Sequence, residues 1–156
     1  PGERSDRFEE ACQVIVSLLT RETTTFAGTH YTLTDARCDP KPVQRPHPPI
    51  CIGGSGEKRT LRTVARYAQH WNFDTGGIER FVRARDVLWR HCDEVGRDRG
   101  EIRLSCQVPY HGDAAATADI AAQFGGAGAQ LAIVYLPQPY TAAVLEPLAQ
   151  ALRKVG

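Results

Sequence analysis

The sequence predicts an α/β protein in which a parallel sheet of the barrel type carries helices on its outer face. Two observations lead to this prediction: a strand, a loop and a helix follow one another four times from residue 50 onward, and the third of these strands alternates between apolar and polar residues. Successive strand–loop–helix units give parallel strands with helices packed outside them. The alternation then favours a barrel, because one face of its strands meets helices while the other lines a lumen that can be polar. An edge strand of an open sheet would look similar.

Three segments precede the repeated units. Residues 6–20 are expected to form a helix that begins at a capping box made by Asp6 and Glu9. Its apolar face would carry Phe8, Cys12, Ile15 and Leu19. Residues 23–33 suggest a hairpin that turns at Ala27 and Gly28. Residues 38–49 contain five prolines and predict a stiff connector without helix or central strand. The chain therefore divides into a helix (1–22), a hairpin with its connector (23–49) and four βα units (50–156), all within a single partial domain.

The four strands of these units are expected at residues 50–52, 70–73, 101–108 and 131–136. Helices are expected after each of them, and the second should stop at Gly96. The last helix would place Leu145, Leu148, Leu152 and Val155 on one face, with Pro147 marking either a break or its first turn.

The composition narrows the functional class. Hydrophobic residues make up 42% and charged residues 24% of the chain, and 19 basic side chains nearly balance 18 acidic ones. This balance is typical of an ordinary soluble protein and argues against a nucleic-acid or membrane surface. The five cysteines show no metal-site spacing, so we expect free thiols in a reducing cytoplasm and no metal. Because the chain starts at Pro1 and has no methionine, we expect that it derives from a longer translation product.

A glycine-rich loop follows the first strand of the repeated units. It consists of Gly53, Gly54, Ser55 and Gly56, and Lys58 and Arg59 come directly after it. Glycines let an anion approach the backbone closely, and the N-terminus of a helix offers unpaired N–H groups to it. A second loop, residues 74–77, lies at the same end of the next strand, so the two could hold one phosphate jointly. The alternative is a plain turn between strand and helix, since the loop fits neither a Walker A nor a GxGxxG motif.

No catalytic residue can be assigned from the pattern. The sequence shows no Ser-His-Asp or Cys-His arrangement and no paired carboxylates. His111 follows the third strand, where the catalytic loops of a barrel lie, and is therefore a candidate for facing a ligand or substrate.

Three segments resemble the luciferase-like monooxygenase superfamily. Residues 1–11 are similar to the start of the helix after its fourth strand, and residues 25–31 resemble its Phe-x-Gly-x-x-Tyr insertion hairpin. The most recognisable stretch is residues 42–56, which ends in the glycine loop. Residues 69–72 (Gln-His-Trp-Asn) stand where the family has an Asp-Gly-Trp-Asn-like motif, from which they depart at the first two positions.

The resemblance implies that this chain is about the C-terminal half of the (β/α)8 barrel, strands five to eight, with the hairpin as an insertion. It implies that the phosphate-bearing tail of a cofactor is bound by the two loops and nearby residues, namely Gly53, Gly54, Ser55, Gly56, Lys58, Asn72, Thr75 and Gly76. The subgroup that the chain most resembles uses coenzyme F420, a deazaflavin. Family members carry most contacts to the cofactor ring and substrate on the first four strands, so no catalytic residue is transferred.

The parent reaction implied in this way is hydride transfer between F420 and a small organic substrate. One alternative is an FMN-dependent monooxygenase, in which reduced flavin reacts with oxygen. Another is a half-barrel without catalytic activity that binds phosphate or dimerises. Four βα units leave two strand edges open, so the expected partner is the missing N-terminal half-barrel or a second copy of the chain.

Overall fold

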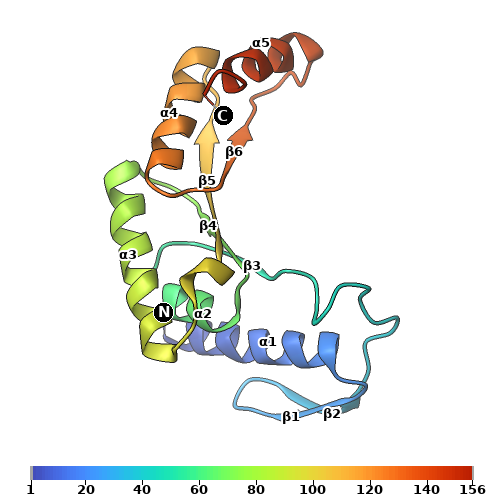
Figure 1. Cartoon of the computed structure of the whole chain (residues 1–156). Coiled ribbons are helices and arrows are strands. Elements are labelled where there is room, and N and C mark those ends of the chain that lie inside the picture. Colours follow the sequence, from blue (N-terminus) through green and yellow to red (C-terminus); the bar gives the residue numbers. More distant parts are fainter. Residues whose placement is uncertain (1, 156) are drawn as a thin grey trace.

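The computed structural model describes residues 2–155, which form a small hairpin and a helix-covered parallel sheet (Figure 1). The elements are α1 (Gly2–Thr20), β1 (Thr24–Ala27), β2 (Thr32–Ala36), β3 (Cys51–Gly53), α2 (Thr60–Tyr67), β4 (His70–Phe73), α3 (Ile78–Val95), a 3₁₀ turn (Arg99–Glu101), β5 (Arg103–Pro109), α4 (Ala114–Gly126), β6 (Leu131–Tyr135) and α5 (Ala142–Leu152). The hairpin, the proline-rich connector and the four strands predicted from the sequence are thereby confirmed.

The main sheet has the strand order β3-β4-β5-β6, and every pair in it is parallel. Sequential order with a helix between neighbouring strands is what repeated βα units produce. Figure 1 shows α3 and α4 following one side of the sheet, while the opposite side faces open space. Within the described residues, β3 and β6 are the two edges of the sheet.

The outer face of the sheet and the helices form one apolar core. Its centre is an aromatic cluster: Trp71 of β4 stacks on Phe81 of α3 with ring centroids 5.6 Å apart, and Phe73 meets Phe81 edge-on at 5.4 Å. Phe124 of α4 completes the cluster at 5.4 Å from Phe81. Aromatic pairs of this geometry add about 0.5–1.5 kcal/mol each beyond the burial of their area. The cluster therefore fixes α3 and α4 on β4.

The inner face of the sheet is polar, as the alternation in the third strand predicts. On β5, Leu104, Cys106 and Val108 are buried toward the helices, whereas Arg103 and Gln107 lie on the other face with Ser105 between them. On β4, Trp71 and Phe73 are buried and His70 and Asn72 alternate with them. A helix-covered sheet with one polar face matches a strand wall that lines a lumen.

Helix α1 differs from its prediction at its start. It begins at Gly2, and the proposed capping box is wrong because Asp6 and Glu9 lie inside the helix. Both carboxylates instead face arginines in α2 or just before it: Asp6 accepts from Arg59 at 2.7 Å, and Glu9 accepts from Arg62 at 3.2 Å and from Arg66. The acidic residues that resembled a cap thus join two helices.

The predicted apolar face of α1 is only partly correct. Phe8 and Ile15 are 42% and 47% exposed, while Cys12 and Val14 are buried. Helix α1 packs on α2 and β1, and this contact covers a narrower stripe than the predicted face. A similar difference occurs in α5, where Leu148 is buried but Leu145 is 51% exposed. Pro147 lies inside this helix, so it marks neither a break nor the first turn.

The loop of the hairpin is fastened to α1 by the Glu10 carboxylate, and β1 is joined to α1 by a hydrogen bond between Thr24 and Ser17 at 2.9 Å. Glu10 accepts hydrogen bonds from the backbone N–H groups of Thr29 at 2.9 Å, His30 at 2.9 Å and Tyr31 at 3.2 Å. The bond from His30 is the main reason that the pKa of Glu10 is lowered. A side chain at Gly28 would collide with this carboxylate, which explains the glycine in the Phe-x-Gly-x-x-Tyr segment.

We predict that the chain associates in solution through the edge strand β6. Its backbone groups and inner-face side chains are available to another strand, and unpaired edges of this kind template association. The substitution Ile133→Lys, which adds a charge to this strand, should shift the chain toward the monomer in analytical ultracentrifugation. Val43→Lys is the matched control, because Val43 is 93% exposed in the connector. A monodisperse monomer at high concentration for the parent chain would contradict the prediction.

Candidate functional site

The two glycine loops lie side by side at the carboxyl edge of the sheet. Gly53 ends β3 and pairs in register with Asn72 of β4. The N–H of Gly54 continues the ladder by donating to the carbonyl of Asn72 at 3.1 Å. Because β3 and β4 are parallel neighbours, the loops that follow them leave the sheet at the same edge. The sequence prediction that residues 53–56 and 74–77 are brought together is met by this register.

Backbone geometry requires glycine at two positions of these loops. Gly54 has φ +111° and Gly76 has φ +123°, values that L-residues with side chains rarely adopt. A Cβ at Gly76 would also lie 2.7 Å from Cδ of Arg80, and one at Gly56 would lie 2.8 Å from Oγ1 of Thr60. Both loops therefore pack too closely against the helices that follow them to take side chains at these positions.

The first loop is held in place from the core. The indole N–H of Trp71 donates to the carbonyl of Gly54 at 2.7 Å, and Trp71 itself is fully buried in the aromatic cluster. A buried indole N–H needs an acceptor, so this bond satisfies the tryptophan and orients the loop at once.

Several backbone donors remain available at the carboxyl edge. Within residues 2–155, the N–H groups of Ser55, Gly56, Thr75 and Gly76 have no protein acceptor. Helices α2 and α3 also begin without a capping side chain, at Arg59 and Gly77 respectively. Uncapped helix N-termini present unpaired N–H groups and a partial positive charge. The arrangement can therefore accept an anion.

The cations nearest the first loop differ from those that the sequence suggests. Lys58 and Arg59 lie in the turn before α2 and not in its first helical turn. Arg59 is engaged elsewhere, since its Nη1 donates to Asp6 at 2.7 Å and to the carbonyl of Gly2 at 2.8 Å.

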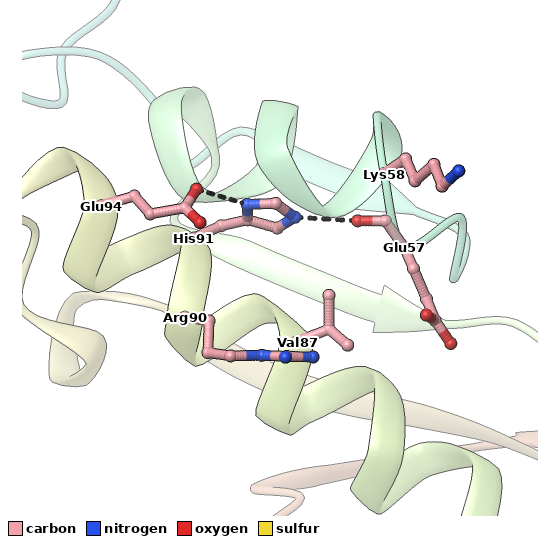
Figure 2. A pocket seen from close by; sticks show the side chains of 6 residues that line it. All are labelled: Glu57, Lys58, Val87, Arg90, His91 and Glu94. Carbon is pink, nitrogen blue, oxygen red and sulfur yellow. Dashed lines mark hydrogen bonds and ion pairs between the residues drawn. The ribbon is translucent and has the colours of Figure 1, made fainter.

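Lys58 lines a cavity of about 250 Å³ between its turn and α3, together with Glu57, Val87, Arg90, His91 and Glu94. Figure 2 shows the His91 ring between Glu57 and Glu94, with Lys58 pointing away from the imidazole. The two ring nitrogens lie 2.8 Å from the Glu57 carbonyl and 2.9 Å from the Glu94 carboxylate. His91 thus ties α3 to the turn that carries Lys58.

Arg80 is the residue that the sequence analysis missed. It lies in the first turn of α3, its Nη2 donates to Oγ of Ser55 at 2.9 Å, and its Cδ adjoins Gly76. One arginine side chain therefore touches both loops, with its guanidinium at Ser55 and its aliphatic stem beside Gly76. The signal that could have found it is an arginine three residues after the second glycine pair, because the first turn of a helix faces the loop before it.

Two cavities flank the loops. One, of about 280 Å³, is lined by Arg4, Ser5, Phe8, Gly53 and Thr60, so the start of α1 adds a second arginine beside Gly53. The other, of about 270 Å³, is lined by Asp74, Thr75, Gly76, Gln107, Pro109 and Tyr135, and extends along the carboxyl ends of β4, β5 and β6.

Two further kinds of candidate group remain, a histidine and the cysteines. His111 is exposed in the loop that follows β5. Burial raises the pKa of the Cys12 and Cys106 thiols to about 11, which leaves them protonated and poorly nucleophilic. Among residues 2–155, no cluster of three or more His, Cys, Asp or Glu side chains could hold a metal ion.

A parallel sheet with helices on one face and glycine loops at its carboxyl edge defines part of a barrel-type α/β fold. Residues 1–154 match the family described as luciferase-like monooxygenase, and the chain belongs to this family. None of the helices in the described part of the chain has the length and apolar character needed to cross a membrane.

The relatives include an FMNH2-dependent enzyme and an F420-dependent enzyme. The chain is 35% identical over 82 residues to an FMNH2-dependent dimethylsulfone monooxygenase of Pseudomonas putida, covering 53% of this chain and 22% of that protein. It is 32% identical over 116 residues to an F420-dependent glucose-6-phosphate dehydrogenase of Microbacterium testaceum, covering 71% of this chain and 33% of that protein. The chain thus matches about a fifth to a third of the length of these relatives.

The fold matches a solved structure over its whole length. An F420-dependent secondary alcohol dehydrogenase in complex with an F420–acetone adduct aligns with a TM-score of 0.86 at 15% identity, covering 99% of this chain and 63% of that one. The barrel fold class predicted from the sequence is confirmed by this match.

We predict that Trp71→Phe loosens the first loop while the aromatic core survives. The phenyl ring keeps most of the packing, but the carbonyl of Gly54 loses its donor, which should lower the free energy of unfolding by about 1–3 kcal/mol. Urea denaturation measures the change. Trp89→Phe is the matched control, because Trp89 is partly exposed on α3 and contacts Arg99. Equal effects in both variants would show that the bond to Gly54 contributes nothing.

Proposed function

We propose that this chain forms the phosphate-binding half of a flavin- or deazaflavin-dependent oxidoreductase, with the tail of the cofactor held by the loops 53–56 and 74–77. The observation that carries the proposal is the position of Arg80, which donates to Ser55 in one loop and adjoins Gly76 in the other. Two glycine loops with available N–H groups and a cation between them suit a phosphate monoester.

The residues present fit such a group. Gly54 and Gly76 have positive φ values, and side chains at Gly56 and Gly76 would collide with Thr60 and Arg80. Each backbone N–H bond to a charged acceptor contributes about 1.5–3 kcal/mol before ordering costs. A helix N-terminus adds about 0.3–1 kcal/mol from its dipole. Gly53, Ser55, Thr75 and Asn72 belong to the same proposed site, and Lys58 adds positive charge from the neighbouring turn.

The parent reaction that we propose is hydride transfer between F420 and a small organic substrate. When bound, the cofactor supplies the hydride chemistry, and the protein supplies binding and orientation. The residues of this chain would anchor the tail at the carboxyl edge of the sheet, beside the polar inner face of β4 and β5. Arg4 and Arg80 are the positive charges that an acidic F420 tail would need.

FMN is the second candidate cofactor. It is favoured by the 35% identity to an FMNH2-dependent monooxygenase. The two candidates differ in the charge of the tail, because F420 carries an oligoglutamate chain beyond its phosphate and FMN does not. The two candidates are distinguished by titrating both cofactors at low and high salt. If the parent uses F420, the affinity for F420 should fall more steeply with salt than the affinity for FMN.

We predict that the loop variants weaken the binding of inorganic phosphate in the order Gly54→Val, Arg80→Gln, Ser55→Ala. Valine at φ +111° strains the turn by about 1–3 kcal/mol and narrows the approach. Arg80→Gln removes the cation, and Ser55→Ala leaves the backbone donors in place. Isothermal titration calorimetry measures the affinities. Arg83→Gln is the control, since Arg83 pairs with Glu57 one turn further along α3 at 2.8 Å. Unchanged binding in a folded Gly54→Val variant would show that the loop is only a turn.

We also predict that the chain by itself gives no turnover with F420 or FMN. The sheet offers four strands, so a cofactor ring anchored at one edge would lack the opposite wall of the barrel. Stopped-flow absorbance of reduced cofactor, with and without substrate, is the measurement. Substrate-dependent oxidation by the purified chain would refute this expectation.

A further inference from the structure

Three polar side chains form a hydrogen-bonded row on the inner face of the sheet. Nε2 of His70 lies 2.7 Å from Oγ of Ser105, and Oγ of Ser105 donates to Oδ1 of Asn72 at 2.9 Å. Ser105 is fully buried, although β5 turns it toward the lumen face. The row runs along β4 from its first residue toward the edge where the glycine loops begin.

The direction of the hydrogen bonds in this row follows from proton counting. A serine hydroxyl has one proton, and Ser105 gives it to Asn72. The nitrogen of His70 that faces Ser105 must therefore be the donor, which places the imidazole proton on Nε2. Burial, and next the positive charge of Arg103, lower the pKa of His70 and keep the ring neutral near pH 7. Arg103 and Cys51 are its register partners on the two neighbouring strands.

The row leaves one group of Asn72 available. Its Oδ1 is occupied by Ser105, while its Nδ2 has no protein acceptor within residues 2–155. This nitrogen faces the space beside Gly53, because a Cβ at Gly53 would lie 4.0 Å from it. Gly53 carries no side chain and is exposed, so a ligand atom can reach the amide.

We propose that His70 and Ser105 are positioning residues that hold Asn72 with its amide N–H2 group directed over Gly53, where it donates to a phosphate oxygen of the ligand. The inference rests on the proposed function for the presence of a phosphate, but the orientation of Asn72 can be tested without any ligand.

The orientation is tested by ¹⁵N NMR of the side chains in the whole chain. We expect His70 to carry its proton on Nε2, and we expect the Asn72 N–H2 signals to shift as His70 titrates. Ser105→Ala should uncouple the two, Ser105→Thr should restore the coupling, and Gln107→Ala on the same face should change neither. Coupling that persists in Ser105→Ala, or a neutral His70 protonated on Nδ1, would overturn the proposal.

The same row predicts a pH effect with a definite sign. The pKa of His70 is lower in the folded chain than the 6.5 of a free imidazole, so the unfolded chain binds a proton first as pH falls. The free energy of unfolding should therefore decrease from about pH 6.5 down to the folded pKa, and His70→Gln should remove this decrease. An identical slope in both proteins would contradict a half-buried, neutral His70.

Phosphate affinity tests the consequence for binding. Asn72→Asp keeps the acceptor for Ser105 but replaces the amide donor by a charged oxygen, and should weaken inorganic phosphate by about tenfold or more. Ser105→Ala should weaken it by about fivefold, with recovery in Ser105→Thr. If Gly54→Val loses binding while Ser105→Ala and Asn72→Asp bind like the parent, the role of Asn72 is refuted and the phosphate site is not. Parent-like binding in all of these variants would refute the phosphate site, and the NMR titration would then still decide the orientation of Asn72.

Discussion

The hydrogen bond from the Trp71 indole to the Gly54 carbonyl is the constraint on which the candidate site depends. The indole is stacked on Phe81 inside the core, so it cannot move without disturbing α3. Arg80 lies one residue before Phe81, and its position over the two loops is therefore set by the same stacking. The packing of one buried ring thus determines the positions of both the first loop and the helix beside it. This is how supporting contacts usually hold a binding site in shape.

The two faces of the sheet carry separate tasks. Apolar residues such as Leu104 and Val108 bind the helices, and their alternates, such as Ser105 and Gln107, line the inner face. Since successive residues of a strand point to opposite sides, one short strand packs against the helices with one face and presents polar side chains on the other. The arrangement also explains why a fully buried serine is tolerated: its hydroxyl is satisfied on both sides, by His70 and by Asn72.

Most of the fold could be predicted from the sequence because strands and helices here obey simple periodicity. The strand from His70 to Phe73 and the stop of α3 at Gly96 were found at their observed positions, since a left-handed residue after a helix favours glycine. The errors have a common cause. In the sequence, Asp6 and Glu9 look like a helix cap and Arg59 looks like a phosphate ligand. In the structure, α1 packs on α2, so that Asp6 pairs with Arg59 and Glu9 pairs with Arg62. Arg80 was missed for the same reason, because its partner Ser55 is 25 residues away. Local patterns do not encode such long-range pairings.

The Glu10 contact makes the hairpin a unit that can open separately from the sheet. Its loop is tied down by one half-buried carboxylate whose pKa is lowered by the backbone N–H bonds that it accepts. Stability that depends on a lowered pKa is retained above the ordinary value of 4.5 and is lost as pH falls through the folded value. Mild acid should therefore release residues 28–31 while the aromatic cluster stays closed. Amide hydrogen exchange would register this as local unfolding of the insertion, with the strands of the barrel wall still protected.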